Sequence, residues 1–166
     1  MNVLLISANT ESINMPTLPF GLGCVAETVR RAGHAIELLD LMDSDDPRLN
    51  IEAAIQNAHP DVIAISVRNI DDQKMEDTKF LLGQVKEIVS DCREFSDAPV
   101  VLGGAGFSIA PAAALEYLEA DMGIQGEGEI AFLNLLERLR QNRSLDDAPG
   151  LYLRGKGLQG ERSFCQ

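Results

Sequence analysis

Side chains that could bind a ligand lie in four short loops, each directly after an apolar segment with strand character. Two loops carry hydroxyl, amide or guanidinium groups, and they contain Ser7, Asn9, Thr10, Ser66, Arg68 and Asn69. The other two are rich in glycine, and they contain Gly103, Gly104, Gly106, Phe107, Gly126, Glu127 and Gly128. Glycine lets a backbone approach a ligand closely and leaves its N–H groups accessible. The loops predict ligand binding through backbone and hydroxyl groups, although glycines that only turn the chain would give the same pattern.

Motifs for nucleotide cofactors and phosphoryl transfer are incomplete. The segment Gly21-Leu22-Gly23 lacks the third glycine of the dinucleotide fingerprint and does not directly follow a strand. No phosphate loop of the form G-x-x-x-x-G-K-S/T occurs. A phosphoacceptor receiver domain would need an aspartate at the end of its third strand and a lysine at the end of its fifth. The corresponding strand-like segments here, residues 61–67 and 122–125, have Ser66 and Gln125 at those positions.

Nucleophile–base pairs and metal-ligand clusters are also missing from the sequence. His34 and His59 fall outside the four loops, and we expect both to be surface or helix-capping residues. The three cysteines are too far apart for a C-x-x-C metal site. Cys24 and Cys92 occupy apolar helical positions and are expected to be buried, whereas Cys165 stands next to the last residue. We therefore expect no catalytic residue and no metal ligand in this chain.

Strand-like and helix-like segments alternate along the chain. Strands are expected at residues 3–6, 36–41, 61–67, 99–102 and 122–125. Helices are expected at residues 22–29, 51–58, 75–92 and 130–140, with another one opened by Pro111. This alternation predicts an α/β fold with a doubly wound, five-stranded parallel sheet of order 2-1-3-4-5. We expect one domain over residues 1–148, and a small C-terminal hairpin and the start of a linker over residues 149–166. The four loops should meet at the carboxyl edge of the sheet.

Composition and charge argue against several classes of binding partner. The 166 residues contain 26 acidic and 14 basic side chains, a formal charge of −12. This balance argues against nucleic acid and against an anionic membrane surface as partners. The apolar runs are much shorter than the ~20 residues that span a bilayer, and the start of the chain lacks the pattern of a signal peptide. A cytoplasmic protein is expected.

Five short segments follow one another in a recurring order. They are Pro19-Phe20-Gly21-Leu22-Gly23, Arg31-Ala32-Gly33-His34, ISVRNID at residues 65–71, LGGAGFS at residues 102–108, and Gly126-Glu127-Gly128-Glu129. In this order and spacing they resemble the cobalamin (B12)-binding domain of B12-dependent radical S-adenosylmethionine (SAM) enzymes. The resemblance extends from Met1 to about Arg154.

The resemblance implies a flavodoxin-like domain that binds cobalamin. The corrin ring would lie over the carboxyl ends of the strands, and the nucleotide tail would enter a groove beside the sheet with its dimethylbenzimidazole off the cobalt. Ser66 and the Gly103-Gly104 pair would line the tail, and residues 126–129 would border the corrin. The remaining residues of the four loops, with Gly21 and Gly23, complete the implied cofactor site.

Two signatures of related proteins are absent. The D-x-H-x-x-G motif, whose histidine ligates cobalt in methionine synthase and the carbon-skeleton mutases, does not occur, since Ala32 and Asn57 stand where the aspartate would precede His34 and His59. The C-x-x-x-C-x-x-C loop that holds a 4Fe–4S cluster does not occur either. The resemblance therefore implies an N-terminal domain of a longer enzyme, a methyltransferase or related radical enzyme. Its C-terminal radical SAM domain would use SAM and a 4Fe–4S cluster.

Two other interpretations remain open at this point. The same fold could be a stand-alone binding module for cobalamin or for flavin mononucleotide, because Ser7-Ala8-Asn9-Thr10-Glu11-Ser12 supplies hydroxyls after the first strand. It could also be a non-enzymatic interaction domain in which the glycines are purely structural.

Overall fold

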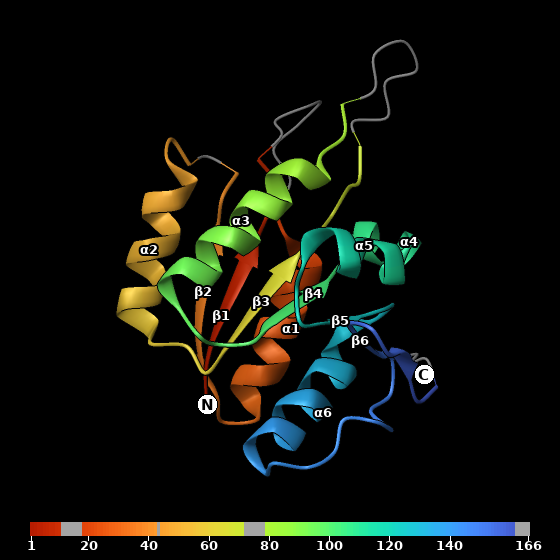
Figure 1. Ribbon diagram of the computed structural model, residues 1–166. Helices are drawn as coiled ribbons and strands as arrows, with labels where there is room; N and C mark the ends of the chain where they lie inside the picture. Colours follow the sequence, from red (N-terminus) through yellow and green to blue (C-terminus); the bar gives the residue numbers. More distant parts are fainter. Residues whose placement is uncertain (11–17, 43, 72–78, 162–166) are drawn as a thin grey trace.

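A single mixed sheet forms the centre of the molecule (Figure 1). The structure is a computed structural model and describes residues 1–10, 18–42, 44–71 and 79–161. The strands are β1 (Asn2–Ser7), β2 (Ala35–Asp40), β3 (Val62–Ser66), β4 (Val100–Gly103), β5 (Met122–Ile124), β6 (Leu151–Leu153) and β7 (Gly157–Gln159). Their order is β2-β1-β3-β4-β5-β6-β7; the first five are parallel, and β6 and β7 pair antiparallel to their neighbours.

Helices cover both faces of the sheet. They are α1 (Phe20–Arg31), α2 (Pro47–Ala58), α3 (Leu82–Phe95), α4 (Ala105–Ile109), α5 (Pro111–Leu118) and α6 (Gly128–Arg140). One hydrophobic cluster lies between the sheet and α2, α3, α4 and α5, and a second lies between the sheet and α1 and α6 (Figure 1). The sheet is therefore doubly wound, as the alternation of segments predicts.

Local sequence signals set the ends of several helices. Asp46 caps α2 by accepting a hydrogen bond from the Leu49 N–H at 3.1 Å, and Pro47 occupies the first helical position. His59 ends the same helix in a left-handed conformation, as expected of a capping residue. Gly33 follows α1 with a φ of +88°, which a side chain would strain.

The structure confirms the predicted parallel core of the sheet. It departs from the prediction at one edge of the sheet and at two helices. The sheet has seven strands rather than five, because the expected terminal hairpin pairs with β5 as β6 and β7. The short helix α4 precedes the helix that Pro111 opens. The third helix was expected from residue 75, but residues 72–78 lie outside the described part of the chain. Its observed start is at Leu82, after Leu81 N–H donates to the Ile70 carbonyl.

The cysteines divide between a buried and a half-buried position. Cys92 is fully buried in α3, and burial raises the pKa of its thiol to about 12. Cys24 is only half-buried, so the expectation for it was wrong. It follows the buried Leu22 by two residues, about 200° around the helix, and so points away from the buried stripe. Cys165 lies outside the described residues.

His34 is buried, contrary to the expectation of a surface or capping residue. Its side chain is 4% exposed where α1 leads into β2, and its Nε2 lies 3.8 Å from a Glu137 carboxylate oxygen of α6. Its Nδ1 has no hydrogen-bond partner among the residues that the structure describes. Burial lowers the pKa of His34 below its ordinary value of 6.5, and the positive charges of the Met1 amino group and Arg140 act in the same direction, against the opposing effect of Glu137.

No helix in the described ranges is long and apolar enough to cross a membrane.

The burial of His34 predicts a specific loss of stability in mild acid. Below pH 6.5 the unfolded chain binds a proton at this position that the folded chain resists, so the free energy of unfolding should fall as the pH drops through 6.5. His34→Gln should flatten this dependence between about pH 5 and pH 7, measured by urea unfolding. Carboxylates such as Glu27, whose pKa its arginine partners lower to about 2, titrate below that window. His59→Gln is the matched control; equal profiles for the parent and His34→Gln would contradict the prediction.

Candidate functional site

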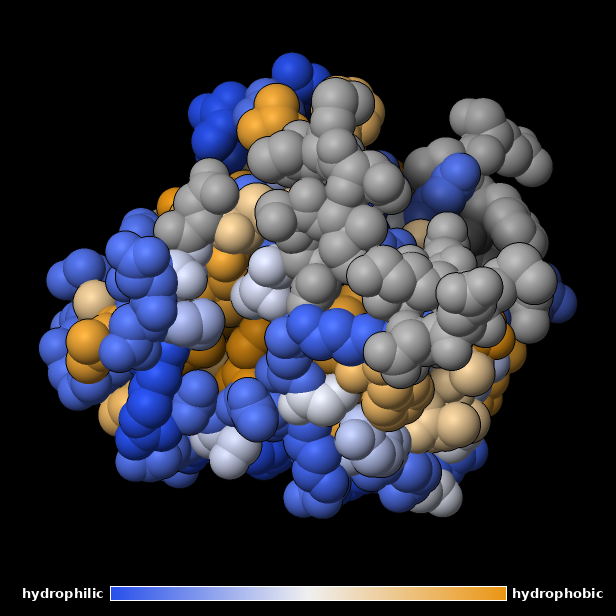
Figure 2. Space-filling model, turned by 90° about the horizontal axis from the view of Figure 1, so that it is seen from above, coloured by the Kyte–Doolittle hydropathy of each residue, from blue (hydrophilic) through white to orange (hydrophobic). Residues whose placement is uncertain are grey.

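A cavity of about 790 Å³ opens at the carboxyl edge of the parallel strands. It lies on the face of the sheet that α1 and α6 cover, and both helices contribute their first turns to its walls. Viewed from above the strand ends, the molecule shows a hollow with hydrophobic residues at its bottom and hydrophilic residues along its border (Figure 2). This volume is within the range of small-molecule and cofactor sites.

The floor of the cavity consists of two rows of side chains on adjacent strands. Strand register places Ser7, Ser66 and Gly103 side by side on β1, β3 and β4 in the outer row. Two residues earlier on each strand, Leu5, Ala64 and Val101 form the inner row. Because side chains alternate between the two faces of a strand, both rows face α1 and α6. The cavity exists because the central positions of these rows carry small residues.

Glycines at this edge differ in what their missing side chains allow. A Cβ atom on Gly103 would meet only the Ile124 carbonyl oxygen, at 4.0 Å. A Cβ atom on Gly104, whose φ is +96°, would stand 2.6 Å from the Val67 carbonyl oxygen, and one on Gly106 would stand 3.0 Å from the backbone of Arg68. Gly104 and Gly106 are therefore needed to pack the start of α4 against the loop after β3, and Gly103 leaves open space.

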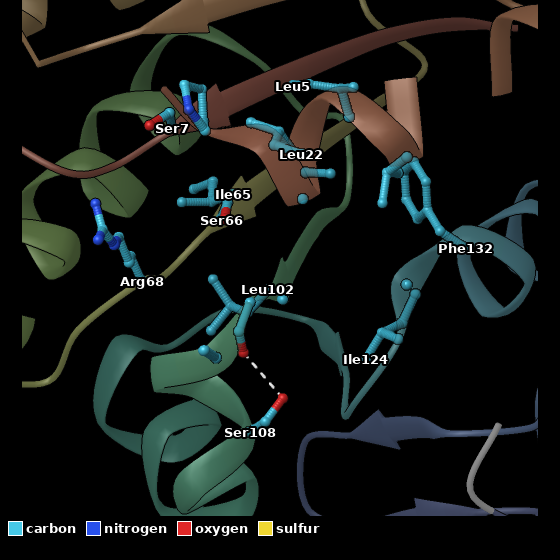
Figure 3. A pocket seen from close by; sticks show the side chains of 18 of the residues that line it. Leu5, Ser7, Leu22, Ile65, Ser66, Arg68, Leu102, Ser108, Ile124 and Phe132 are labelled. Atoms are coloured by element: carbon cyan, nitrogen blue, oxygen red, sulfur yellow. Dashed lines mark hydrogen bonds between the residues drawn. The ribbon is translucent and has the colours of Figure 1, made fainter. Parts of the chain in front are cut away.

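A chain of hydrogen bonds joins the loops after β4 and β5. The Ser108 hydroxyl donates to the Gly104 carbonyl at 2.9 Å (Figure 3). It also accepts from the Gly126 N–H at 3.0 Å. The Gln125 amide donates to the Ser108 carbonyl at 3.0 Å, and the Tyr152 hydroxyl of β6 donates to Gln125 at 3.2 Å. Sequence reasoning missed Ser108, Gln125 and Tyr152, since no motif marks a hydrogen bond between loops.

Donors are available around the cavity. Among the described residues, neither the Ser7 nor the Ser66 hydroxyl makes a hydrogen bond. The helices α1 and α6 both begin at the cavity without a side-chain cap, at Pro19 and Glu127 respectively. Their first N–H groups carry partial positive charge and favour an anionic group such as a phosphate.

Three charged side chains among the described residues border the cavity. They are Arg68, Glu127 and Glu129. Arg68 is exposed, stands two residues after Ser66, and makes no ion pair within the described part of the chain (Figure 3).

Ten of the fifteen sequence-predicted residues line this cavity. They are Ser7, Asn9, Gly21, Ser66, Arg68, Gly103, Gly104, Gly126, Glu127 and Gly128. Thr10 and Asn69 instead line a much smaller hollow on the other side of the loop after β3, where the Thr10 hydroxyl donates to Gln84 at 3.1 Å. Asn9 and Arg68 border both hollows.

Phe107, Gly106 and Gly23 do not line the cavity. Phe107 is fully buried on the opposite face, where a Cβ atom on Gly123 would stand 2.2 Å from its ring. Its side chain is part of the α3–α5 core because α4 turns it under the sheet. Gly23 is exposed on α1 with open space around it.

The fold and the cavity define a ligand-binding α/β domain whose site lies at the switch point of a doubly wound sheet. The family model for the B12 binding domain matches residues 6–136, so the chain belongs to that family.

Relatives and solved structures agree with this assignment. The chain is 29% identical over 153 residues to tryptophan 2-C-methyltransferase of Streptomyces laurentii, covering 90% of this chain and 26% of that enzyme. It is 30% identical over 142 residues to hopanoid C-3 methylase of Methylococcus capsulatus, covering 84% and 26%. A structure of the radical SAM methyltransferase TsrM from Kitasatospora setae, with cobalamin and a 4Fe–4S cluster bound, matches with a TM-score of 0.89 at 28% identity. That match covers 99% of this chain and 29% of TsrM. The chain thus spans about a quarter to a third of the length of the curated relatives that it matches.

The contrast between Gly103 and Gly104 predicts opposite effects of the same substitution. Gly103→Val should retain most of the stability of the parent, because valine suits a strand and enters open space. Gly104→Val should lose at least ~2 kcal/mol, because a branched residue is forced into a positive φ against the Val67 carbonyl. Urea unfolding of the two variants checks this. Equal stabilities would contradict the assigned roles.

Proposed function

We propose that this chain is the cobalamin-binding domain of a B12-dependent radical SAM methyltransferase, and that it holds cobalamin with the benzimidazole off the cobalt and without a histidine ligand. The observation that carries the proposal is the open cavity behind the Ser7–Ser66–Gly103 row, in a chain of the B12-binding family. Bound cobalamin would supply a cobalt centre that can carry a methyl group.

The residues of the cavity fit the tail of such a cofactor. The open space over Gly103 would admit it, and the hydroxyls of Ser7 and Ser66 and the uncapped start of α6 would hold its phosphate without a cationic pocket. Residues 126–129 stand at the border, where the mostly neutral amides of the corrin rim would meet them. In this arrangement the chain binds and orients the cofactor and contributes no catalytic residue.

Two features of this chain support a cobalt without a protein ligand. His34 is buried beyond the opposite end of β1, where Met1 accepts the backbone hydrogen bond of Ala35, and His59 caps α2 at that same end. Arg68 borders the cavity, and a guanidinium stays protonated and cannot ligate cobalt. In the proposed complex the Arg68 side chain would occupy the space below the cobalt and keep water out of it.

The rest of the proposed enzyme would lie outside this chain. A radical SAM domain that follows the B12-binding domain would supply SAM and a 4Fe–4S cluster, because this sequence lacks the cluster motif. The names of the relatives, which include two methyltransferases and a methylase, support methyl transfer as its reaction. We place the protein in the cytoplasm, consistent with its free, buried Cys92 thiol.

Titration with cobalamin tests the proposal. The chain should retain the red colour of the cofactor through gel filtration, and the cob(II)alamin form should give an electron paramagnetic resonance spectrum without nitrogen superhyperfine splitting. Splitting from an axial nitrogen would overturn the base-off, ligand-free state. Retention of yellow flavin mononucleotide in preference to cobalamin would overturn the proposed cofactor.

Arg68→Ala provides a test of the lower face of the corrin. Removing the guanidinium should admit water and shift the cob(II)alamin spectrum from four-coordinate towards five-coordinate. Unfolding stability should change by less than ~1 kcal/mol, because Arg68 is exposed and makes no ion pair in the described residues. Arg143→Ala, at an exposed position after α6, is the control. An unchanged spectrum would leave Arg68 as an ordinary surface charge.

A further inference from the structure

We propose that the inner part of the cavity selects corrinoids by the chemistry of their lower base: it accepts an apolar aromatic base such as dimethylbenzimidazole and discriminates against adenine. This inference rests on the proposed function, and it concerns which members of the corrinoid class this chain binds.

The inner part of the cavity is lined mainly by apolar side chains. Its floor is the row of Leu5, Ala64 and Val101, and its walls come from the first two turns of α1 and α6. The apolar side chains from those helices include Leu22, Val25 and Phe132. Leu22 and Phe132 are labelled in Figure 3. The floor row itself carries no polar side chain, and its backbone groups are paired within the parallel sheet. Glu129, in the first turn of α6, also lines the cavity.

Polar groups are confined to the outer part. Ser7 and Ser66 lie in the row nearer the carboxyl edge, two residues beyond Leu5 and Ala64. Two residues of a strand correspond to about 6.6 Å, which is more than twice the length of a hydrogen bond. A ring seated on the inner row is therefore out of reach of the hydroxyls that would hold the phosphate.

This separation distinguishes the two kinds of base. The six-membered ring of dimethylbenzimidazole carries only carbon and hydrogen, and it would pack against Ala64 and the Phe132 ring. The corresponding ring of adenine carries ring nitrogens and an amino group, which would lose their hydrogen bonds to water without replacement. An unsatisfied buried polar group of this kind weakens binding by about 10- to 100-fold.

Ala64 sets the space for the base. It is the smallest residue of the inner row and lies between Leu5 and Val101 on the central strand of the three. Its half-buried side chain faces the cavity, so a larger residue here would fill the seat of the ring without displacing packed neighbours.

Three corrinoids provide the test with the unmodified chain. Dissociation constants are measured by equilibrium dialysis for cobalamin, for its analogue with adenine as the lower base, and for cobinamide, which has no nucleotide tail. Cobalamin should bind about 10- to 100-fold more tightly than the adenine analogue. Equal affinities of cobalamin and the adenine analogue would overturn the selectivity and leave the proposed function intact. Failure of all three to bind would overturn the proposed function, and the selectivity with it.

A substitution at Ala64 tests where the base is seated. Ala64→Leu should reduce the affinity for cobalamin to that for cobinamide and leave the affinity for cobinamide within about twofold of the parent value. Ala53→Leu, at an exposed position of α2 on the opposite face of the sheet, is the matched control and should change neither affinity. Thermal unfolding verifies that each variant folds, and Ala64→Val replaces Ala64→Leu if the latter does not. The proposed seat would be overturned if an Ala64 variant folds and still binds cobalamin more tightly than cobinamide by the same factor as the parent.

Discussion

Two backbone hydrogen bonds between the loop after β3 and the turn after β4 fix the edge at which the cavity opens. The Val67 N–H donates to the Gly103 carbonyl at 2.8 Å, and the Gly106 N–H donates to the Val67 carbonyl at 3.0 Å. They bring two backbones so close that a side chain at Gly104 has no room. The position of α4, the bonds of Ser108 and the open space over Gly103 all follow from this contact, so the site depends on backbone geometry before any side chain is considered.

The parallel core could be predicted from the sequence because its signals are local. Buried strands such as β3 consist of consecutive aliphatic residues, and glycine or proline marks their boundaries, as at Gly33 and Pro47. The rule that ligands bind at the carboxyl edge predicted a common location for the loop residues, and ten of the fifteen line one cavity there. The family resemblance added the identity of the cofactor, which spacing alone could not give, because a doubly wound sheet accepts many ligands.

Predictions failed where an outcome depends on contacts between distant segments. His34 was expected at the surface, but α6 lies over it, and nothing near residue 34 indicates which helix packs there. Phe107 stood in a glycine-rich loop like a ligand contact, yet the short helix α4 directs it onto Gly123 of β5. The cavity floor was missed for the same reason: Ala64 becomes notable only when the register places it between Leu5 and Val101.

The central position of β1 also affects how the chain reaches this fold. β1 pairs with β2 on one side and with β3 on the other, and Val3 pairs with Val62, which is 59 residues away along the chain. Pairing over such separations slows folding, because long loops must close before the contacts form. Until then the apolar segments of β1 and β3 are exposed, a condition that favours aggregation. The net charge of −12 opposes association between copies during that interval. The acidic surface thus has a use in the nascent chain that is independent of any ligand.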